Sequence, residues 1–77
     1  MRKLLYLILF IPFASFSQNY YGNGLTKYKN GDHYGAIADF TKAIEINPNY
    51  ANAYYNRGVS KGKLKDNYGA IADYTKA

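Results

Sequence analysis

The 77-residue sequence contains no cysteine and a single histidine, His33. Without cysteine the chain can form no disulfide, no cysteine metal site and no lipid-modified cysteine. With one histidine, a serine or threonine nucleophile has no evident base held by a third group, and a metal ion has only scattered carboxylates. We therefore predict no enzyme activity, no cofactor and no metal site, and we interpret His33 as a solvated turn residue.

Signatures of nucleotide binding and of N-linked glycosylation are also missing. Gly22 and Gly24 follow no strand pattern, and no further glycine stands at phosphate-loop spacing. None of the eight asparagines has serine or threonine two positions later, so the sequence has no acceptor for an N-linked glycan.

The sequence has little that could span a bilayer. Residues 4–16 carry no charge, but this run has 13 residues and is interrupted by Pro12. A spanning helix needs about 20 apolar residues. We therefore predict no stable membrane span once this segment has been removed.

The same segment has the features of a secretory signal. Two basic residues precede the apolar run, and Ser15 and Ser17 supply the small side chains expected before a cleavage site. We predict a signal peptide at residues 1–17, a cut between Ser17 and Gln18, and export to the periplasm or out of the cell. The alternative is that the segment is retained as an uncleaved anchor.

The sequence also lacks a large excess of positive or negative charge. After removal of the signal, eight Lys and Arg stand against five Asp and Glu, a net charge of about +3. Aromatic residues interleaved with lysines can stack on single-stranded nucleic acid. Export and the low net charge weigh against that hypothesis, and we predict no nucleic-acid partner.

What the sequence does contain is an internal repeat. Residues 34–43 return as residues 68–77 with nine of ten identical, at an offset of 34. Six further identities recur at the same offset: Tyr20 and Tyr54, Tyr21 and Tyr55, Gly24 and Gly58, Lys27 and Lys61, Lys29 and Lys63, Asp32 and Asp66. Asp39 and Asp73 also recur at this offset, and we interpret them as surface residues of the repeat in preference to metal ligands.

Each copy is predicted to form two helices. In the first copy, Ala36, Ile37, Phe40, Ala43 and Ile44 share one helical stripe. Asp32 is the expected N-cap of that helix, Gly31 ends the helix before it, and Asn47 with Pro48 stops the stripe. The predicted helices are residues 19–30, 33–46, 51–64 and 67–77.

Glycine inside a helix costs roughly 1 kcal/mol relative to alanine. Gly24 and Gly58 lie inside predicted helices and recur at the repeat offset. We expect a close approach of two backbones to compensate, with Gly24 opposite Ala36 and Gly58 opposite Ala70.

The 34-residue period and its small residues resemble the tetratricopeptide repeat. One copy carries the resemblance in Tyr54, Gly58, Ala70, Tyr74 and Ala77, and the other in Tyr20, Gly24, Ala36, Phe40, Ala43 and Pro48. The resemblance implies an all-α fold of antiparallel helix hairpins in a short right-handed superhelical array. It places repeat 1 at residues 18–50 and repeat 2 at residues 51–77.

The sequence departs from the usual pattern of this family at two places in each copy. Asn23 and Arg57 stand where a leucine is usual, and Lys27 and Lys61 where an aromatic is usual. These departures affect the packing of the first helix of each copy.

Repeat 2 is incomplete, because Ala77 matches Ala43, which lies inside a predicted helix. Stacked repeats bury their apolar faces against neighbours and need about three copies for stability. We therefore expect a fragment of a longer array. The alternative, if translation stops at Ala77, is self-association through the uncapped C-terminal end.

The resemblance implies that the first helix of each hairpin lines a concave face that holds a peptide or a partner helix. The groove residues it implies are Tyr21, Leu25, Tyr28, Lys29, Tyr55, Asn56, Val59 and Lys63. Neighbours on a helix do not share a face, so we expect Tyr20 and Tyr54 in the core and Tyr21 and Tyr55 exposed.

Lysines near the ends of the first helices have two explanations. They complement the negative end of the helix dipole, worth about 0.3–1 kcal/mol each, or Lys29 and Lys63 select an acidic peptide. Some members of the family clamp a C-terminal carboxylate, but Tyr21 and Tyr55 stand where the first clamp lysine belongs, so no such clamp is predicted.

The leading functional prediction is an exported scaffold that binds a protein or peptide, with an acidic partner as one hypothesis. The alternative is that the chain is the recruiting segment of a larger exported enzyme or receptor.

Overall fold

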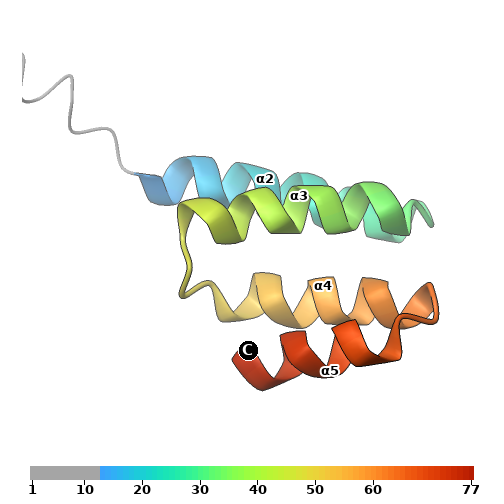
Figure 1. Ribbon diagram of the computed structural model, residues 1–77. Coiled ribbons are helices and arrows are strands. Elements are labelled where there is room, and N and C mark those ends of the chain that lie inside the picture. Colours follow the sequence, from blue (N-terminus) through green and yellow to red (C-terminus); the bar gives the residue numbers. More distant parts are fainter. Residues whose placement is uncertain (1–12) are drawn as a thin grey trace, which may run out of the picture.

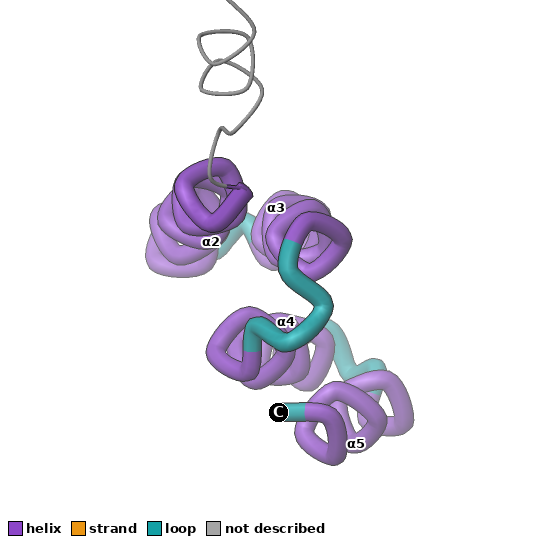
Figure 2. The backbone as a smooth tube through the Cα atoms, turned by 90° about the vertical axis from the view of Figure 1, so that its left-hand side faces the viewer, coloured by secondary structure: helices purple, strands orange, loops and turns teal. Residues whose placement is uncertain are grey.

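A computed structural model describes residues 13–77, which form four helices in two stacked antiparallel hairpins (Figure 1). The helices are α2 (Phe13–Lys29), α3 (His33–Ile46), α4 (Ala51–Lys63) and α5 (Asn67–Lys76). Viewed along the helices, α2 and α4 lie on one side of the stack and α3 and α5 on the other (Figure 2). The α4 helix packs on α5 within its own hairpin and on α3 of the preceding hairpin, and it touches α2, whereas α5 contacts α4 alone among these helices. The predicted all-α hairpin fold is confirmed.

The last three helices match their predicted bounds to within one residue, but α2 begins six residues earlier than predicted. The predicted cut between Ser17 and Gln18 therefore falls inside α2. Ser17 is fully buried, and its hydroxyl donates a hydrogen bond of 2.8 Å to the carbonyl oxygen of Ala43. Residues 1–12 of the predicted signal lie outside the described residues.

The turns inside the two hairpins are built alike. Asp32 caps α3 by accepting a hydrogen bond of 2.9 Å from the Gly35 amide, and Asp66 caps α5 by the same contact. Gly31, which follows α2, has a φ of +81°. The residue at the same repeat position is Lys65, which adopts a φ of +70° although it has a side chain. The predicted cap and stop signals are confirmed.

The core lies between the two hairpins and within each of them. Phe40 is fully buried between α2 and α3, where its ring lies against Gly24. A second cluster joins the hairpins through Ala43 and Ile44 of α3 and Ala53 and Tyr54 of α4. Three partly buried tyrosines pack against that cluster: Tyr20, Tyr21 and Tyr50.

The two helix glycines do mark close approaches, but one partner differs from the prediction. A Cβ on Gly24 would lie 2.6 Å from Cε1 of Phe40, so the nearest neighbour is this ring and not Ala36. A Cβ on Gly58 would lie 2.8 Å from the ring of Tyr74 and 3.2 Å from the carbonyl oxygen of Ala70. A large ring lies on each glycine, and at Gly58 the backbone of Ala70 approaches closely as well, as predicted.

Within residues 13–77, none of the helices has the length and apolar character needed to cross a bilayer.

Replacing Gly24 by alanine is expected to destabilise the protein, with Gly22→Ala as the matched control on the same helix. Phe40 is fully buried and cannot move away from the new methyl group, whereas nothing lies within 4 Å of a Cβ on Gly22. Both substitutions gain helix propensity of about 1 kcal/mol, so their difference reports the overpacking, about 1–3 kcal/mol. Urea unfolding of both variants measures it, and equal stabilities would show that the contact is not tight.

Candidate functional site

The α2–α4 side of the stack carries most of the residues predicted to line a groove. Tyr21 of α2 and Asn56 of α4 are joined directly, because the Asn56 side-chain amide donates a hydrogen bond of 2.8 Å to the Tyr21 hydroxyl. The Tyr21 ring packs 4.9 Å from the ring of Tyr50 and 5.7 Å from that of Phe40, measured between centroids. Two of the predicted residues, 35 positions apart in sequence, are thus held together by the fold.

The tyrosine pairs behave only partly as predicted. Tyr54 is buried and Tyr55 is 54% exposed, as expected. Tyr20 and Tyr21 are both half-buried, so the expected division between core and surface is wrong for the first pair. The reason is that Tyr50 covers Tyr21, whereas Tyr55 meets only the ring of Tyr74, 5.6 Å away and itself 44% exposed.

The other predicted groove residues divide by exposure. Leu25, Tyr28 and Val59 are half-buried, while Lys29 and Lys63 are exposed in the last turns of α2 and α4. The half-buried His33 meets the ring of Tyr28 edge-on at 5.3 Å, so its interpretation as a solvated residue is wrong. Binding by this set of residues stays a prediction.

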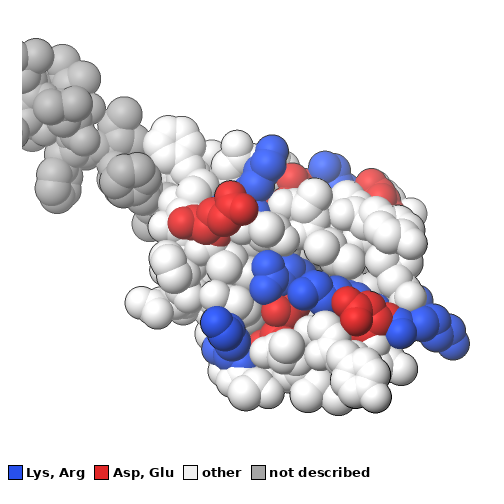
Figure 3. Space-filling view, in the orientation of Figure 1, with Lys and Arg blue, Asp and Glu red and all other residues white. Residues whose placement is uncertain are grey.

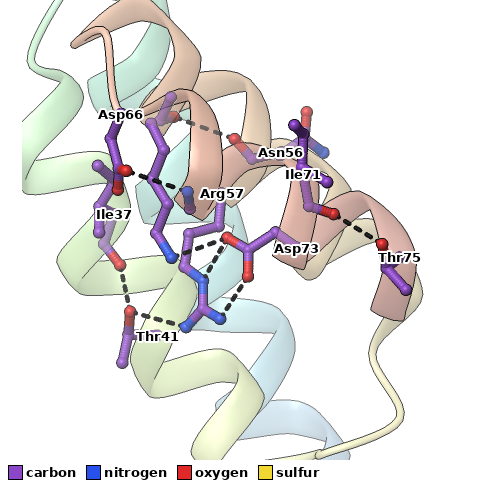
Figure 4. Close-up of polar contacts among 11 residues, drawn as sticks. Ile37, Thr41, Asn56, Arg57, Asp66, Ile71, Asp73 and Thr75 are labelled. Carbon is purple, nitrogen blue, oxygen red and sulfur yellow. Dashed lines mark hydrogen bonds and ion pairs between the residues drawn. The ribbon is translucent and has the colours of Figure 1, made fainter.

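A buried ion cluster, which the sequence analysis missed, connects three helices (Figure 4). Arg57 of α4 donates two hydrogen bonds to the carboxylate of Asp73 of α5, from Nε at 2.9 Å and from Nη2 at 2.7 Å. Lys61 adds an ion pair of 3.1 Å, and the remaining Nη1 of Arg57 donates to the Thr41 hydroxyl of α3 at 3.2 Å. One guanidinium therefore links the second hairpin to the first.

The charges of this cluster stabilise one another. Burial alone would raise the pKa of the Asp73 carboxyl, but the hydrogen bonds from Arg57 and Lys61 outweigh it and hold that pKa below its ordinary value of 3.8. The hydrogen bond to Asp73 raises the pKa of Arg57 despite the opposing effect of burial. Asp73 is 3% exposed and remains ionised at neutral pH.

The first hairpin has a smaller version of the same contact. Lys27 lies 2.8 Å from the Asp39 carboxylate, and Asn23 stands at the position of Arg57. The prediction that Asp39 and Asp73 are surface residues is wrong, because both are buried against a lysine of the preceding helix. The joint recurrence of these lysines and aspartates at the repeat offset is the signal that could have revealed the pairing.

The α3–α5 side of the stack faces the viewer in Figure 3, where basic and acidic side chains lie among one another over a largely uncharged surface. No single sign of charge dominates this side. Over the part of the chain that the structure describes, no three metal-ligating side chains come together.

Acid unfolding is expected to depend on Asp73. Because the folded-state pKa of Asp73 is lowered, its contribution to stability is complete above about pH 4 and is lost as the pH falls through that lowered pKa. At pH 7, Asp73→Asn leaves the largely buried guanidinium of Arg57 without its carboxylate partner, with a loss of the order of 3 kcal/mol. Asp39→Asn leaves only Lys27, whose side chain is 44% exposed and solvated, so the loss of stability should be much smaller.

Urea unfolding of the two variants and of the unsubstituted chain between pH 7 and pH 3 measures both effects. The unsubstituted chain and Asp39→Asn should lose stability on acidification, whereas Asp73→Asn should lose much less. Equal losses in the two variants at neutral pH would contradict this assignment.

Comparison with known proteins agrees with the geometry. Residues 24–65 match the family described as TPR repeat, and no curated protein matches the chain. The matched segment covers parts of both hairpins, including the Arg57 link to Thr41. As this segment is more than half of the 77 residues, the chain belongs to the TPR repeat family, whose repeats generally mediate protein–protein interaction.

Proposed function

We propose that the chain is an exported interaction module that binds a peptide or partner helix on its α2–α4 side. The observation that carries this proposal is the hydrogen bond between Tyr21 and Asn56, which joins two helices into one surface. Exposed Tyr55 extends that surface along α4. Tyrosine suits such a surface because it offers a large contact area with few rotatable bonds and a hydroxyl for polar groups.

The proposed partner segment is acidic. Of the four lysines in the last turns of α2 and α4, Lys27 and Lys61 are paired with buried aspartates. Lys29 and Lys63 are exposed, and in the described residues no carboxylate lies within ion-pair distance of either. Each interacts favourably with the negative end of its helix dipole, worth about 0.3–1 kcal/mol, and this interaction does not prevent the ammonium group from pairing with a carboxylate of a partner.

Reversing these two charges is expected to weaken the binding of acidic peptides. Peptides selected from a randomised library on the purified protein should be enriched in Asp and Glu, and their affinity should fall as salt is raised and the charges are screened. Lys29→Glu with Lys63→Glu should raise the Kd at least about tenfold, equivalent to about 1.4 kcal/mol. Titration by fluorescence anisotropy measures both effects.

The control is Lys76→Glu at an exposed position on α5, which changes the charge by as much as Lys29→Glu or Lys63→Glu alone, and it is compared with each of these single substitutions. It should leave the Kd nearly unchanged. If Lys76→Glu weakened binding as much as the α2–α4 substitutions do, the peptide would be held by overall charge and not by this side of the stack.

Export rests on the basic start, the short apolar run and the small side chains before Gln18. Expression of the full sequence in a bacterial host should give a protein outside the cytoplasm whose N-terminal residue is Gln18. Cleavage there removes Ser17 and its buried hydrogen bond to Ala43, so the shortened protein should melt at a lower temperature than an uncleaved one. Mass spectrometry identifies the terminus, and recovery of the uncut chain from the cytoplasm would refute the proposal.

A further inference from the structure

Gly22 is the one helix glycine to which residues 13–77 supply no neighbour. A Cβ placed on it would have nothing within 4 Å among these residues, although Gly22 is exposed and lies well inside α2. The only glycine with a positive φ in the same range is Gly31, so backbone conformation does not require glycine at position 22. Because glycine inside a helix is less stable than alanine, Gly22 weakens α2 with no compensating contact inside the described fold.

Two other helix glycines show what this fold places on such a position. A Cβ on Gly24 would lie 2.6 Å from the ring of Phe40, and a Cβ on Gly58 would lie 2.8 Å from the ring of Tyr74. In both cases an aromatic ring from another helix lies directly on the backbone of the helix that carries the glycine. Within the chain, the use of a glycine in the middle of a helix is therefore to receive an aromatic ring.

The remaining helix glycines lie at helix ends and have neighbours of other kinds. Gly35 and Gly69 make room for the capping carboxylates of Asp32 and Asp66, and Gly62, in the last turn of α4, has the Cβ of Ala70 at 3.9 Å.

Gly22 lies on the side of the stack that is proposed above to bind a peptide. One face of α2 is formed by residues at spacings of four, three and four, and the same repeat positions form a face of α4. These residues are Gln18, Gly22, Leu25 and Lys29 on α2, and Asn52, Asn56, Val59 and Lys63 on α4.

The two faces differ most at the position of Gly22. On α4 this position holds Asn56, whose side chain donates a hydrogen bond to the Tyr21 hydroxyl. On α2 there is no side chain, so a partner can approach the helix backbone closely at Gly22. The half-buried Leu25, one turn later on the same face, adds an apolar contact beside it.

We infer that the partner segment carries an aromatic side chain whose ring lies on Gly22 and against Leu25, so that Gly22 selects an aromatic residue within an acidic segment. This inference rests on the proposed function and specifies its partner. A ring suits the position because its flat face can cover bare helix backbone, as the two rings inside the fold do. Lys29, two turns later on the same face, is exposed and is placed to pair with an acidic residue of the same segment.

Replacing Gly22 by alanine should move stability and affinity in opposite directions. The substitution gains helix propensity and meets nothing within residues 13–77, so the melting temperature of the full chain should rise by about 4 °C or more. The same methyl group stands where the partner ring would lie, so the Kd of the peptide should rise at least about fivefold. A glycine needed only for folding would not give this combination.

The probe is a fluorescein-labelled synthetic copy of an acidic peptide selected from the randomised library on the full chain. Fluorescence anisotropy measures its Kd, and differential scanning calorimetry measures the melting temperature. The matched control is Asn23→Ala, which also gains helix propensity on α2 but lies at an exposed position about 100° away around the helix. It should leave the Kd unchanged. An equal loss of affinity in both variants would overturn the inference, because a stiffer α2 would then be the cause.

A second peptide, with its aromatic residue replaced by alanine, locates the contact. This peptide should bind the unsubstituted chain more weakly, and Gly22→Ala should have little further effect on it, since the two substitutions remove the same contact. An effect of Gly22→Ala that is the same for both peptides would overturn the inference.

The selection itself distinguishes this inference from the proposed function. The selected peptides should be enriched in Phe, Tyr or Trp as well as in Asp and Glu. Acidic peptides that bind without an aromatic residue would overturn the inference and leave the proposed function standing. If no peptide binds, the proposed function fails, and the inference fails with it.

Discussion

The carboxylate of Asp73 is buried almost completely, and the way it is neutralised determines how the two hairpins are joined. A buried carboxylate without partners would be too costly to remain charged. Here Arg57 and Lys61 surround it, so α5 is fixed against α4 by charge as well as by apolar contact. The two hydrogen bonds to Asp73 fix the orientation of the planar guanidinium, so that its third nitrogen points toward Thr41 of the preceding hairpin. A contact within one repeat thereby becomes a contact between repeats.

The second helices of the two copies have nearly the same residues and yet different surroundings. Phe40 and Tyr74 occupy the same repeat position, and both rings lie on a glycine of the preceding helix. Phe40 is fully buried beside the ring of Tyr21, which Tyr50 covers in turn. Tyr74 is 44% exposed, and its aromatic neighbour Tyr55 is exposed as well. Sequence identity therefore specifies the hairpin, while neighbours decide which of its faces remain available to other molecules.

Much of the fold follows from sequence alone, because the stripe of apolar residues, Asp32 as a cap and the stop at Asn47 are local signals with local causes. The start of α2 was not predictable in this way. Its first residues have the small and apolar character of a signal cleavage region, and the burial of Ser17 depends on the distant carbonyl of Ala43. Local pattern carries no information about that contact.

In the candidate site, too, features with local causes could be predicted and contacts between distant residues could not. Tyr55 was placed correctly on the surface by helical spacing, since exposure on a helix depends mainly on which face a residue occupies. The family resemblance implied that Lys29 and Lys63 lie in the groove, and both are exposed. The contact between Tyr21 and Asn56 and the cluster around Asp73 escaped the sequence analysis, because each joins residues of different helices whose relative rotation the sequence does not reveal. The repeat offset identified the recurring lysines and aspartates, but not that they meet.

The coupling between Arg57 and Thr41 tests the central claim most directly, which is that one guanidinium joins the two hairpins. A double-mutant cycle of Arg57→Lys and Thr41→Val, measured by urea unfolding, isolates this contact because lysine retains the charge beside Asp73 but cannot reach both partners. The account predicts a coupling energy of about 0.5–3 kcal/mol, the range for residues in one hydrogen-bonded network. Additive effects of the two substitutions would show that the contact between Arg57 and Thr41 does not join the hairpins and would contradict it.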